Sequence, residues 1–176
     1  MAARAQRLAR LQAAARETGI ELVILRPPLV YGPGVKANFL VLMRLVASGL
    51  PLPFARINNR RSMIFIDNLV DLVGRACLLP GTAGRVLLAR DAADLSTPEL
   101  IRLLSAGLGR PARLFGAPPP ALAVLRRLPK LGPLLSRLTL SLQVDDADTR
   151  AALDWRPPVS PEIGLAATAA AFRNRS

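Results

Sequence analysis

Arginine is the residue type through which this sequence can do the most chemistry. Lys and Arg number 24 among 176 residues, against 12 Asp and Glu, for a formal net charge of +12, and only Lys36 and Lys130 are lysines. A guanidinium presents paired donors that match phosphate oxygens. So large a positive charge also attracts phosphate in a nucleotide, a nucleic acid or an anionic lipid. The arginines are scattered along the chain, however, so the compositional bias of a GC-rich genome explains the charge at least as well.

Other catalytic residue types are scarce. The sequence has no histidine and one cysteine, Cys77, which removes the commonest general base and excludes an intramolecular disulfide or an ordinary zinc site. Cys77 falls in an apolar helical pattern, which predicts core packing. There is no run of 18 uncharged apolar residues, and the first 19 residues lack the apolar stretch of a secretory signal. We therefore expect a cytoplasmic protein without a transmembrane segment.

Helical and strand patterns alternate along the chain. Residues 4–18 predict a helix closed by Gly19, and the apolar run 20–25 predicts a strand buried on both faces of a parallel sheet. This mixture of elements indicates an α/β or α+β class. Further patterns predict helices over 38–48, 68–79, 96–109, 145–155 and from 160 onward, strands over 61–66, 84–89 and 112–116, and two short helices within 117–140.

Several helix starts carry capping signals. Ser96 with Glu99 three residues later predicts a capping box, and Asn38 and Asp67 are expected as N-caps. Trp155 is expected to anchor the last helix rather than to contact a ligand.

The stretch 25–34, "LRPPLVYGPG", is the most informative local feature. Proline fixes φ and removes a backbone donor, and glycine permits close approach of the backbone. A stiff loop after a buried strand predicts a binding wall, because ligands of α/β sheets lie outside the carboxyl ends of the strands. The alternative is an ordinary Pro/Gly turn.

This stretch belongs to an ordered set of motifs. Arg26-Pro27 and Tyr31-Gly32-Pro33 are followed by "NRRSMIFIDNLVDLV", then by "STPEL" and "LDWRPP". In this order and spacing, from about Arg4 to Phe172, the sequence resembles the extended short-chain dehydrogenase/reductase family of NAD-dependent sugar-nucleotide epimerases and dehydratases.

The resemblance implies an α/β fold. It would comprise the C-terminal part of a Rossmann-type doubly wound sheet and a small mixed α/β substrate-binding subdomain. Residues 1–37 would end the dinucleotide-binding domain, and residues 38–176 would form the substrate-binding subdomain, with Rossmann elements interleaved.

The resemblance also assigns site residues. Pro28, Leu29 and Val30 would lie beside the nicotinamide, and Arg61 would grip the diphosphate of a nucleotide-sugar substrate. The remaining predicted substrate-binding residues are Tyr31, Lys36, Asn38 and Asn59. Simpler alternatives are an exposed strand-edge role for Arg61, a helix cap for Asn38 and a turn for Asn59.

Departures from the family pattern limit what this chain can do. Leu29 stands where many relatives have an asparagine, and residues 141–146, "SLQVDD", lack the second substrate-binding arginine, although Ser141 or Gln143 could bind sugar hydroxyls. The glycine-rich dinucleotide turn is absent. The catalytic Tyr-x-x-x-Lys pair is also absent, since its lysine would fall near Arg4 and its tyrosine before Met1.

The sequence therefore predicts the substrate-binding half of an NAD(P)-dependent epimerase or dehydratase, not catalytic alone. NAD or NADP serves the parent family, and no cofactor is expected to bind tightly to this chain by itself. A missing N-terminal half or a second copy would cover the exposed apolar edge of strand 20–25.

Two other functions are open. A non-catalytic subunit of a split enzyme is one. The other is a basic module that binds phosphate, nucleic acid or a membrane surface through Arg126, Arg127, Lys130 and Arg137. Pro129 and Pro133 break that helical run, and aromatic residues are few, so we do not expect a nucleic-acid partner.

Overall fold

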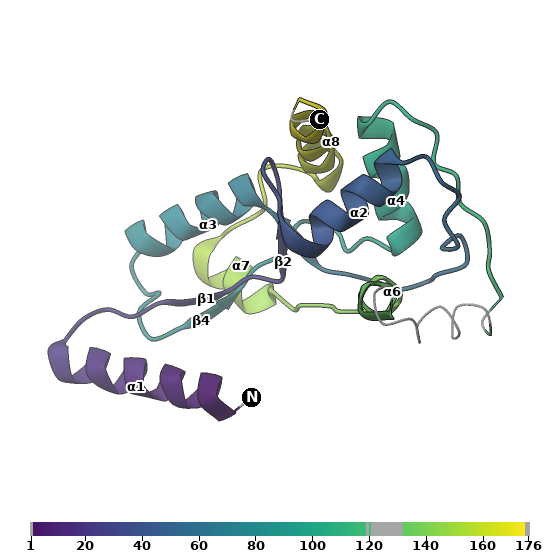
Figure 1. The fold of residues 1–176 in the computed structure, drawn as a ribbon. Helices are drawn as coiled ribbons and strands as arrows, with labels where there is room; N and C mark the ends of the chain where they lie inside the picture. Colours follow the sequence, from purple (N-terminus) through teal and green to yellow (C-terminus); the bar gives the residue numbers. More distant parts are fainter. Residues whose placement is uncertain (1, 119, 121–131, 175–176) are drawn as a thin grey trace.

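A computed structural model of the chain describes residues 2–118, 120 and 132–174 (Figure 1). Strands are short and alternate with helices, as the sequence predicts. None of the described helices is both long enough and apolar enough to cross a bilayer. The elements are α1 (Ala2–Thr18), β1 (Ile24–Arg26), β2 (Leu29–Tyr31), α2 (Ala37–Ala47), β3 (Met63–Phe65), α3 (Ile66–Leu78), β4 (Val86–Leu88), α4 (Thr97–Gly107), α6 (Gly132–Thr139), α7 (Ala147–Leu153) and α8 (Pro161–Arg173).

Most of the predicted elements are present, but the strand predictions need correction. Residues 29–31 form a strand that the proline-rich sequence did not predict. The predicted strand 112–116 is reduced to isolated bridges, Leu52 with Leu114 and Phe54 with Gly116. Of the two short helices expected within 117–140, one is α6, and the basic cluster at 126–130 lies outside the described residues.

The strands form two separate parallel pairs. In one pair Ile24 lies opposite Val86, and in the other Leu29 lies opposite Met63. Pro27 and Pro28 lie between β1 and β2, at the point where the chain leaves one pair and enters the other. Because proline cannot donate to a ladder, this placement ends the first pair cleanly.

The glycine after β2 serves packing inside the protein. A Cβ on Gly32 would lie 2.5 Å from Cγ2 of Ile66, at the start of α3. Likewise, a Cβ on Gly164 would lie 2.9 Å from the ring of Phe65, where α8 crosses β3. The backbone of Gly32 therefore packs closely against α3.

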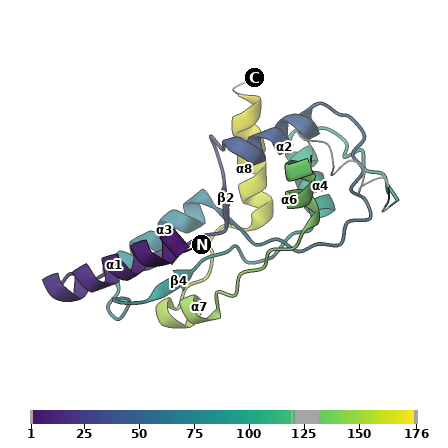
Figure 2. The ribbon, with the colours of Figure 1, turned by 60° about the horizontal axis from the view of Figure 1, so that its bottom comes forward.

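Two apolar clusters hold the elements together. The larger one lies between α2, α4, α8, α6 and the β2–β3 pair, with Met43 and Leu104 wholly buried. The smaller one lies between β4, α3 and α7 around Ile64 and Trp155. Figures 1 and 2 show α2, α4 and α8 gathered at one end of the molecule and α1 at the other.

Two predictions about single residues are wrong. Trp155 is fully buried, but its indole donates to Oδ2 of Asp71 at 2.7 Å, so it anchors α3 rather than the last helix. Cys77 is exposed, because α3 turns Leu72 and Ala76 inward instead.

One of the predicted helix caps forms and two do not. The box of Ser96 and Glu99 forms as predicted, with both reciprocal hydrogen bonds present, and it fixes the start of α4. Asn38 and Asp67 are not N-caps, since Lys36 and Phe65 hold those positions without side-chain hydrogen bonds.

The segment before β1 is less buried than predicted. Residues 22–25 are half-buried, and Ile20 is 67% exposed. Gly19 closes α1 in the left-handed region, as expected (φ 70°). The strand is therefore shorter than the predicted 20–25, and the exposed edge expected for it is present, since β1 has β4 as its one pairing partner among the described residues.

A buried carboxylate fixes the chain entering α7. Asp146 is 2% exposed and accepts from Nε of Arg90 at 2.9 Å and from Nε of Arg150 at 2.7 Å. The family resemblance implies a substrate-binding arginine near residues 141–146, but this segment instead carries an acid with a structural role. The carboxylate offsets two half-buried guanidinium groups.

We predict that Asp146→Asn lowers the free energy of unfolding by about 3 kcal/mol, because it removes the buried counter-charge that Arg90 and Arg150 share, although Arg90 keeps its ion pair with Asp94 at 3.5 Å. Urea unfolding followed by circular dichroism measures this. Asp148→Asn, at an exposed position in the same helix, should leave stability nearly unchanged. Equal losses in the two variants would contradict this account of Asp146.

Candidate functional site

An apolar cavity of about 140 Å³ lies where α2, α4, α6 and the β2–β3 pair meet. Pairing of β2 with β3 places Leu29 beside Met63 in its wall. The polar side chains that line it are Arg61, Arg137 and Asn38. The remaining lining residues are apolar: Leu29, Phe39, Leu42, Met63, Leu100 and Leu138.

Arg61 is held in place by backbone on several sides. Its own N–H and C=O pair with Leu95, which fixes the main chain just before β3. Its Nη1 donates to the carbonyl oxygen of Arg137 and, at 3.0 Å, to that of Leu140. The guanidinium is therefore oriented before any ligand arrives.

The charge at this cavity is uncompensated. Partial burial lowers the pKa of Arg61, and the neighbouring guanidinium of Arg137 lowers it further. Among the described ion pairs none involves Arg61 or Arg137, and no acidic residue lines the cavity. Two like charges at an apolar cavity favour an anionic ligand, because low-dielectric walls strengthen its attraction to both.

Arg137 is not among the predicted substrate-binding residues and is named only for the alternative of a basic binding module. It lies 76 positions after Arg61, on a helix that the sequence showed only as part of a basic, leucine-rich run. No local pattern ties the two arginines together, and only the fold brings them to one cavity.

Asn59 positions this arrangement from inside the protein. It is buried, and its Nδ2 donates to the carbonyls of Leu138 and Leu140, each at 3.2 Å. Its Oδ1 accepts from the N–H of Thr97 at 2.9 Å. It thus ties the end of α6 to the start of α4, and its predicted contact with substrate stays a prediction.

The predicted residues Lys36 and Asn38 face different cavities. Asn38 lines the cavity of Arg61, whereas Lys36 lines one of about 420 Å³ between α2 and α8. Leu40 and Arg44 share that second cavity at helical spacing from Lys36. The structure therefore brings Leu29, Asn38 and Arg61 together, but not Lys36.

Tyr31 is buried, and its hydroxyl is engaged. It donates to Oδ2 of Asp91 at 2.6 Å, and its pKa is raised by burial and then by the Asp91 charge. Oδ1 of Asp91 accepts from the N–H of Phe65 and from Nδ2 of Asn68. Any effect of Tyr31 on substrate would pass through this network, which joins β2, β3 and α3.

Of the other predicted residues, Leu29 lines the cavity and the rest do not. Leu29 is partly exposed in its wall, Pro28 is half-buried just before it, and Val30 packs into the smaller apolar cluster. Ser141 accepts from the N–H of Arg60, and Gln143 donates to Asp94. The suggested sugar contacts of these last two residues therefore compete with existing partners.

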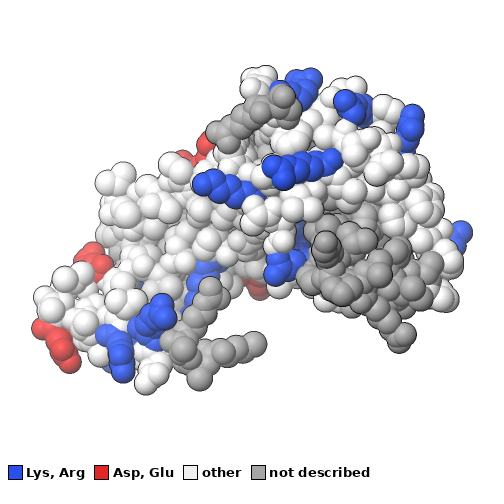
Figure 3. All heavy atoms as spheres, in the orientation of Figure 1, with Lys and Arg blue, Asp and Glu red and all other residues white. Residues whose placement is uncertain are grey.

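Basic side chains are dispersed over one face of the molecule. In the face shown in Figure 3 they lie singly or in twos, with few acidic groups between them. This distribution agrees with the scatter along the sequence.

Known proteins give a consistent picture of what the chain resembles. No family profile matches it. A UDP-glucose 4-epimerase from Vibrio cholerae is 43% identical over 163 residues, which are 92% of this chain and 50% of that enzyme. The chain thus spans about half the length of the curated relative it matches.

Solved structures share the fold at low sequence identity. A UDP-glucuronic acid 4-epimerase from Bacillus cereus in complex with NAD matches 96% of this chain with 48% of its own (TM-score 0.69, 20% identity). RMD from Pseudomonas aeruginosa complexed with NADPH matches 94% with 52% (TM-score 0.68, 18% identity). The predicted α/β class, as part of a Rossmann-type fold, is confirmed.

The buried Asp91 should give the protein a characteristic pH dependence. Burial raises its pKa above the ordinary 3.8, and hydrogen bonds from Tyr31, Phe65 and Asn68 oppose this only in part. A raised pKa in the folded state means that ionisation costs stability as pH rises from about 4. The amide in Asp91→Asn avoids that cost and keeps an oxygen acceptor.

We predict that the unfolding free energy of the wild type falls relative to that of Asp91→Asn as the pH rises from about 4. Urea titrations at stepped pH values measure the difference. A difference that does not change with pH would contradict the assignment to Asp91.

Proposed function

We propose that this chain, which corresponds to the C-terminal half of an extended short-chain dehydrogenase/reductase, supplies the substrate-binding part of an NAD(P)-dependent sugar-nucleotide epimerase or dehydratase. In this proposal residues 1–37 end the dinucleotide-binding domain, and residues 38–176 form the substrate-binding subdomain. The ligand is a nucleoside diphosphate sugar.

One observation carries the proposal: a pre-oriented Arg61 beside Arg137 at an apolar cavity with no acidic lining residue. Guanidinium groups bind phosphate oxygens through paired donors, and a diphosphate supplies enough negative charge for both. Asn38 could then hydrogen-bond a neutral hydroxyl, and the leucines would pack against the flat faces of sugar or base. Lys36 would contact the nucleotide only if the ligand extended past α2 into the second cavity.

The chain offers only part of a cofactor site. In the proposal, the backbone of residues 28–30 would border the nicotinamide, while the side chains of Leu29 and Val30 point to opposite faces of β2. The glycine-rich turn that binds a dinucleotide pyrophosphate is absent from the sequence. When bound, the cofactor accepts and returns a hydride. In our proposal this chain only shapes one side of its pocket.

The remaining machinery would come from the half that this chain lacks relative to its relatives. That half would carry the tyrosine base, its lysine and the phosphate-binding turn. The expected cytoplasmic location stays a prediction.

We predict that the chain binds UDP-glucose saturably, and that Arg61→Ala weakens binding about 10- to 100-fold through loss of charge-assisted hydrogen bonds. Isothermal titration calorimetry at physiological salt measures this, with a duplex oligonucleotide as the competing ligand class. Arg113→Ala, which removes an exposed arginine far along the chain, is the matched control.

Arg61 also supports the carbonyls of residues 137 and 140, so a thermal melt must show that Arg61→Ala is folded. Arg137→Ala keeps that support and tests the same cavity. Undiminished binding in folded Arg61→Ala and in Arg137→Ala would overturn the site, and tighter binding of the oligonucleotide would favour the basic-module alternative.

We also predict no turnover by the isolated chain. Tyr31 is the one tyrosine in the sequence, and burial with its hydrogen bond to Asp91 raises its pKa and keeps it from acting as a base. NMR of UDP-glucose incubated with the chain and NAD should show no epimer at C4. Epimer that forms only when NAD is present would refute this prediction.

A further inference from the structure

The cavity of Arg61 has a floor and a rim of opposite character. The floor residues come from α2, β3, α4 and α6, are no more than 7% exposed and are all apolar: Phe39, Leu42, Met63, Leu100 and Leu138. The rim consists of Leu29, Asn38, Arg61 and Arg137, which are half-buried or exposed. A ligand that enters this cavity therefore meets cations first and hydrocarbon deeper in.

The floor offers no partner to a hydroxyl group. Its side chains carry neither nitrogen nor oxygen, and the carbonyl oxygen of Leu138 already accepts from Nδ2 of Asn59 and from Oγ1 of Thr97. A buried hydroxyl without a hydrogen bond costs binding free energy, because it gives up its contact with water. A glucosyl group has a hydroxyl on nearly every ring carbon, so it suits this floor poorly.

The size of the cavity limits which part of a ligand can occupy it. Its volume of about 140 Å³ is less than the roughly 300 Å³ or more of a complete small-molecule site. It has room for about four or five groups of the size of water, at about 30 Å³ each. One short substituent of a sugar fits this space, whereas a whole nucleotide sugar does not.

Leu29 extends the apolar surface from the floor to the rim. It lies opposite Met63 in the β2–β3 pair and is 36% exposed. Because leucine has neither a donor nor an acceptor, a sugar hydroxyl beside it stays unpaired, whereas a methyl group there gains apolar contact.

Asn38 is the one rim side chain that has both a donor and an acceptor. It lies in the first turn of α2, one residue before the floor residue Phe39. An amide pairs well with another amide, since each supplies an N–H and a carbonyl oxygen. The rim thus suits a substituent that has an amide at its base and a methyl at its tip.

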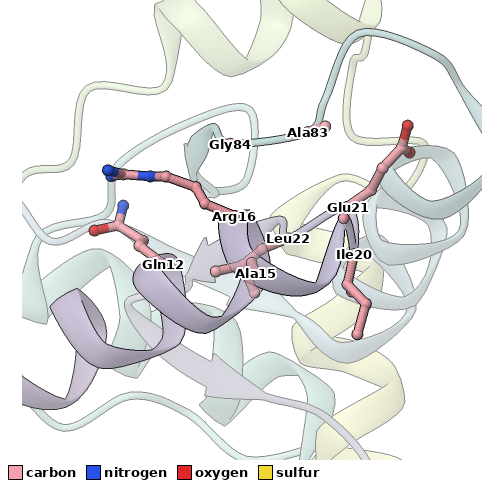
Figure 4. Close-up of a pocket in the computed structure, with 9 residues that line it drawn as sticks. Gln12, Ala15, Arg16, Ile20, Glu21, Leu22, Ala83 and Gly84 are labelled. Atoms are coloured by element: carbon pink, nitrogen blue, oxygen red, sulfur yellow. The ribbon is translucent and has the colours of Figure 1, made fainter.

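Two larger cavities lack this combination of features. The one of about 380 Å³ beside α1 is lined by Arg16 and Glu21, whose opposite charges give no preference for an anion (Figure 4). The one between α2 and α8 is lined by Lys36 and Arg44, but its apolar lining residues are only half-buried. A cationic rim above a buried apolar floor distinguishes the cavity of Arg61 from both.

We propose that this cavity selects nucleoside diphosphate sugars that carry an acetamido group in place of a hydroxyl, and that Leu29 is the specificity-determining residue. The diphosphate would lie at the rim against Arg61 and Arg137. The acetamido group would pair with Asn38 and direct its methyl toward the floor. This inference rests on the proposed function and narrows its substrate class.

The experiment compares UDP-N-acetylglucosamine with UDP-glucose by isothermal titration calorimetry at one salt concentration. The two ligands differ in a single sugar substituent, so their other contacts cancel. UDP-N-acetylglucosamine should bind at least about tenfold more tightly, as expected for an apolar group that fills an apolar pocket.

Leu29→Asn tests the specificity-determining residue. The added amide can pair with a hydroxyl, so binding of UDP-glucose should tighten and the preference should fall to about threefold or less. Val41→Asn makes a comparable change on α2 at a position that is 45% exposed and outside the cavity lining, and this control should keep the full preference. A thermal melt of each variant shows whether it is folded.

The possible results separate this inference from the proposed function. Equal binding of the two sugars by the wild type, or tighter binding of UDP-glucose, would overturn the inference and leave the proposed function standing. A preference that is unchanged in folded Leu29→Asn would overturn the role of Leu29. Binding of neither sugar would refute the proposed function and the inference with it. If Leu29→Asn does not fold, the comparison of the two sugars in the wild type still decides.

Discussion

The hydrogen bonds from the Arg61 guanidinium to the carbonyls of residues 137 and 140 are the interaction on which the site depends. They hold one cation against the helix that carries another, at a cavity lined otherwise by apolar residues and Asn38. In the absence of an anion this arrangement is electrostatically unfavourable, which the lowered pKa of Arg61 reflects. In our proposal a polyanionic ligand offsets that repulsion, because its negative charge attracts both guanidinium groups.

Buried polar side chains elsewhere hold the helices and strands around this site in place. Asn59 joins α6 to α4 beneath Arg61, Asp91 joins Tyr31 to β3 and α3, and Asp146 fixes the entry to α7. Each lies between elements that are distant in sequence, and each has its hydrogen-bonding capacity used. The site therefore depends on long-range polar contacts in addition to the two apolar clusters, and no single local motif forms it.

The sequence predicts the helices well because their signals are local. The capping box at Ser96, the glycine closing α1 and the apolar spacing of α8 need only neighbouring residues to be read. The strand 29–31 was missed because two prolines and a glycine flank it and only its pairing with β3 defines it. The prediction that Cys77 is buried is wrong because apolar residues lie on both faces of α3, so the periodicity of the sequence does not show which face is buried. Leu29, Asn38 and Arg61 could be grouped in advance by family resemblance, whereas Arg137 required the fold.

The most direct test of the account is a crystal structure of the chain with bound UDP-glucose. We predict the diphosphate within hydrogen-bonding distance of both Arg61 and Arg137, with Leu29 and Asn38 beside the ligand. Helix α2 separates this cavity from the one lined by Lys36 and Arg44. A diphosphate bound in that second cavity, with Arg61 still directed only to its backbone carbonyls, would contradict the account.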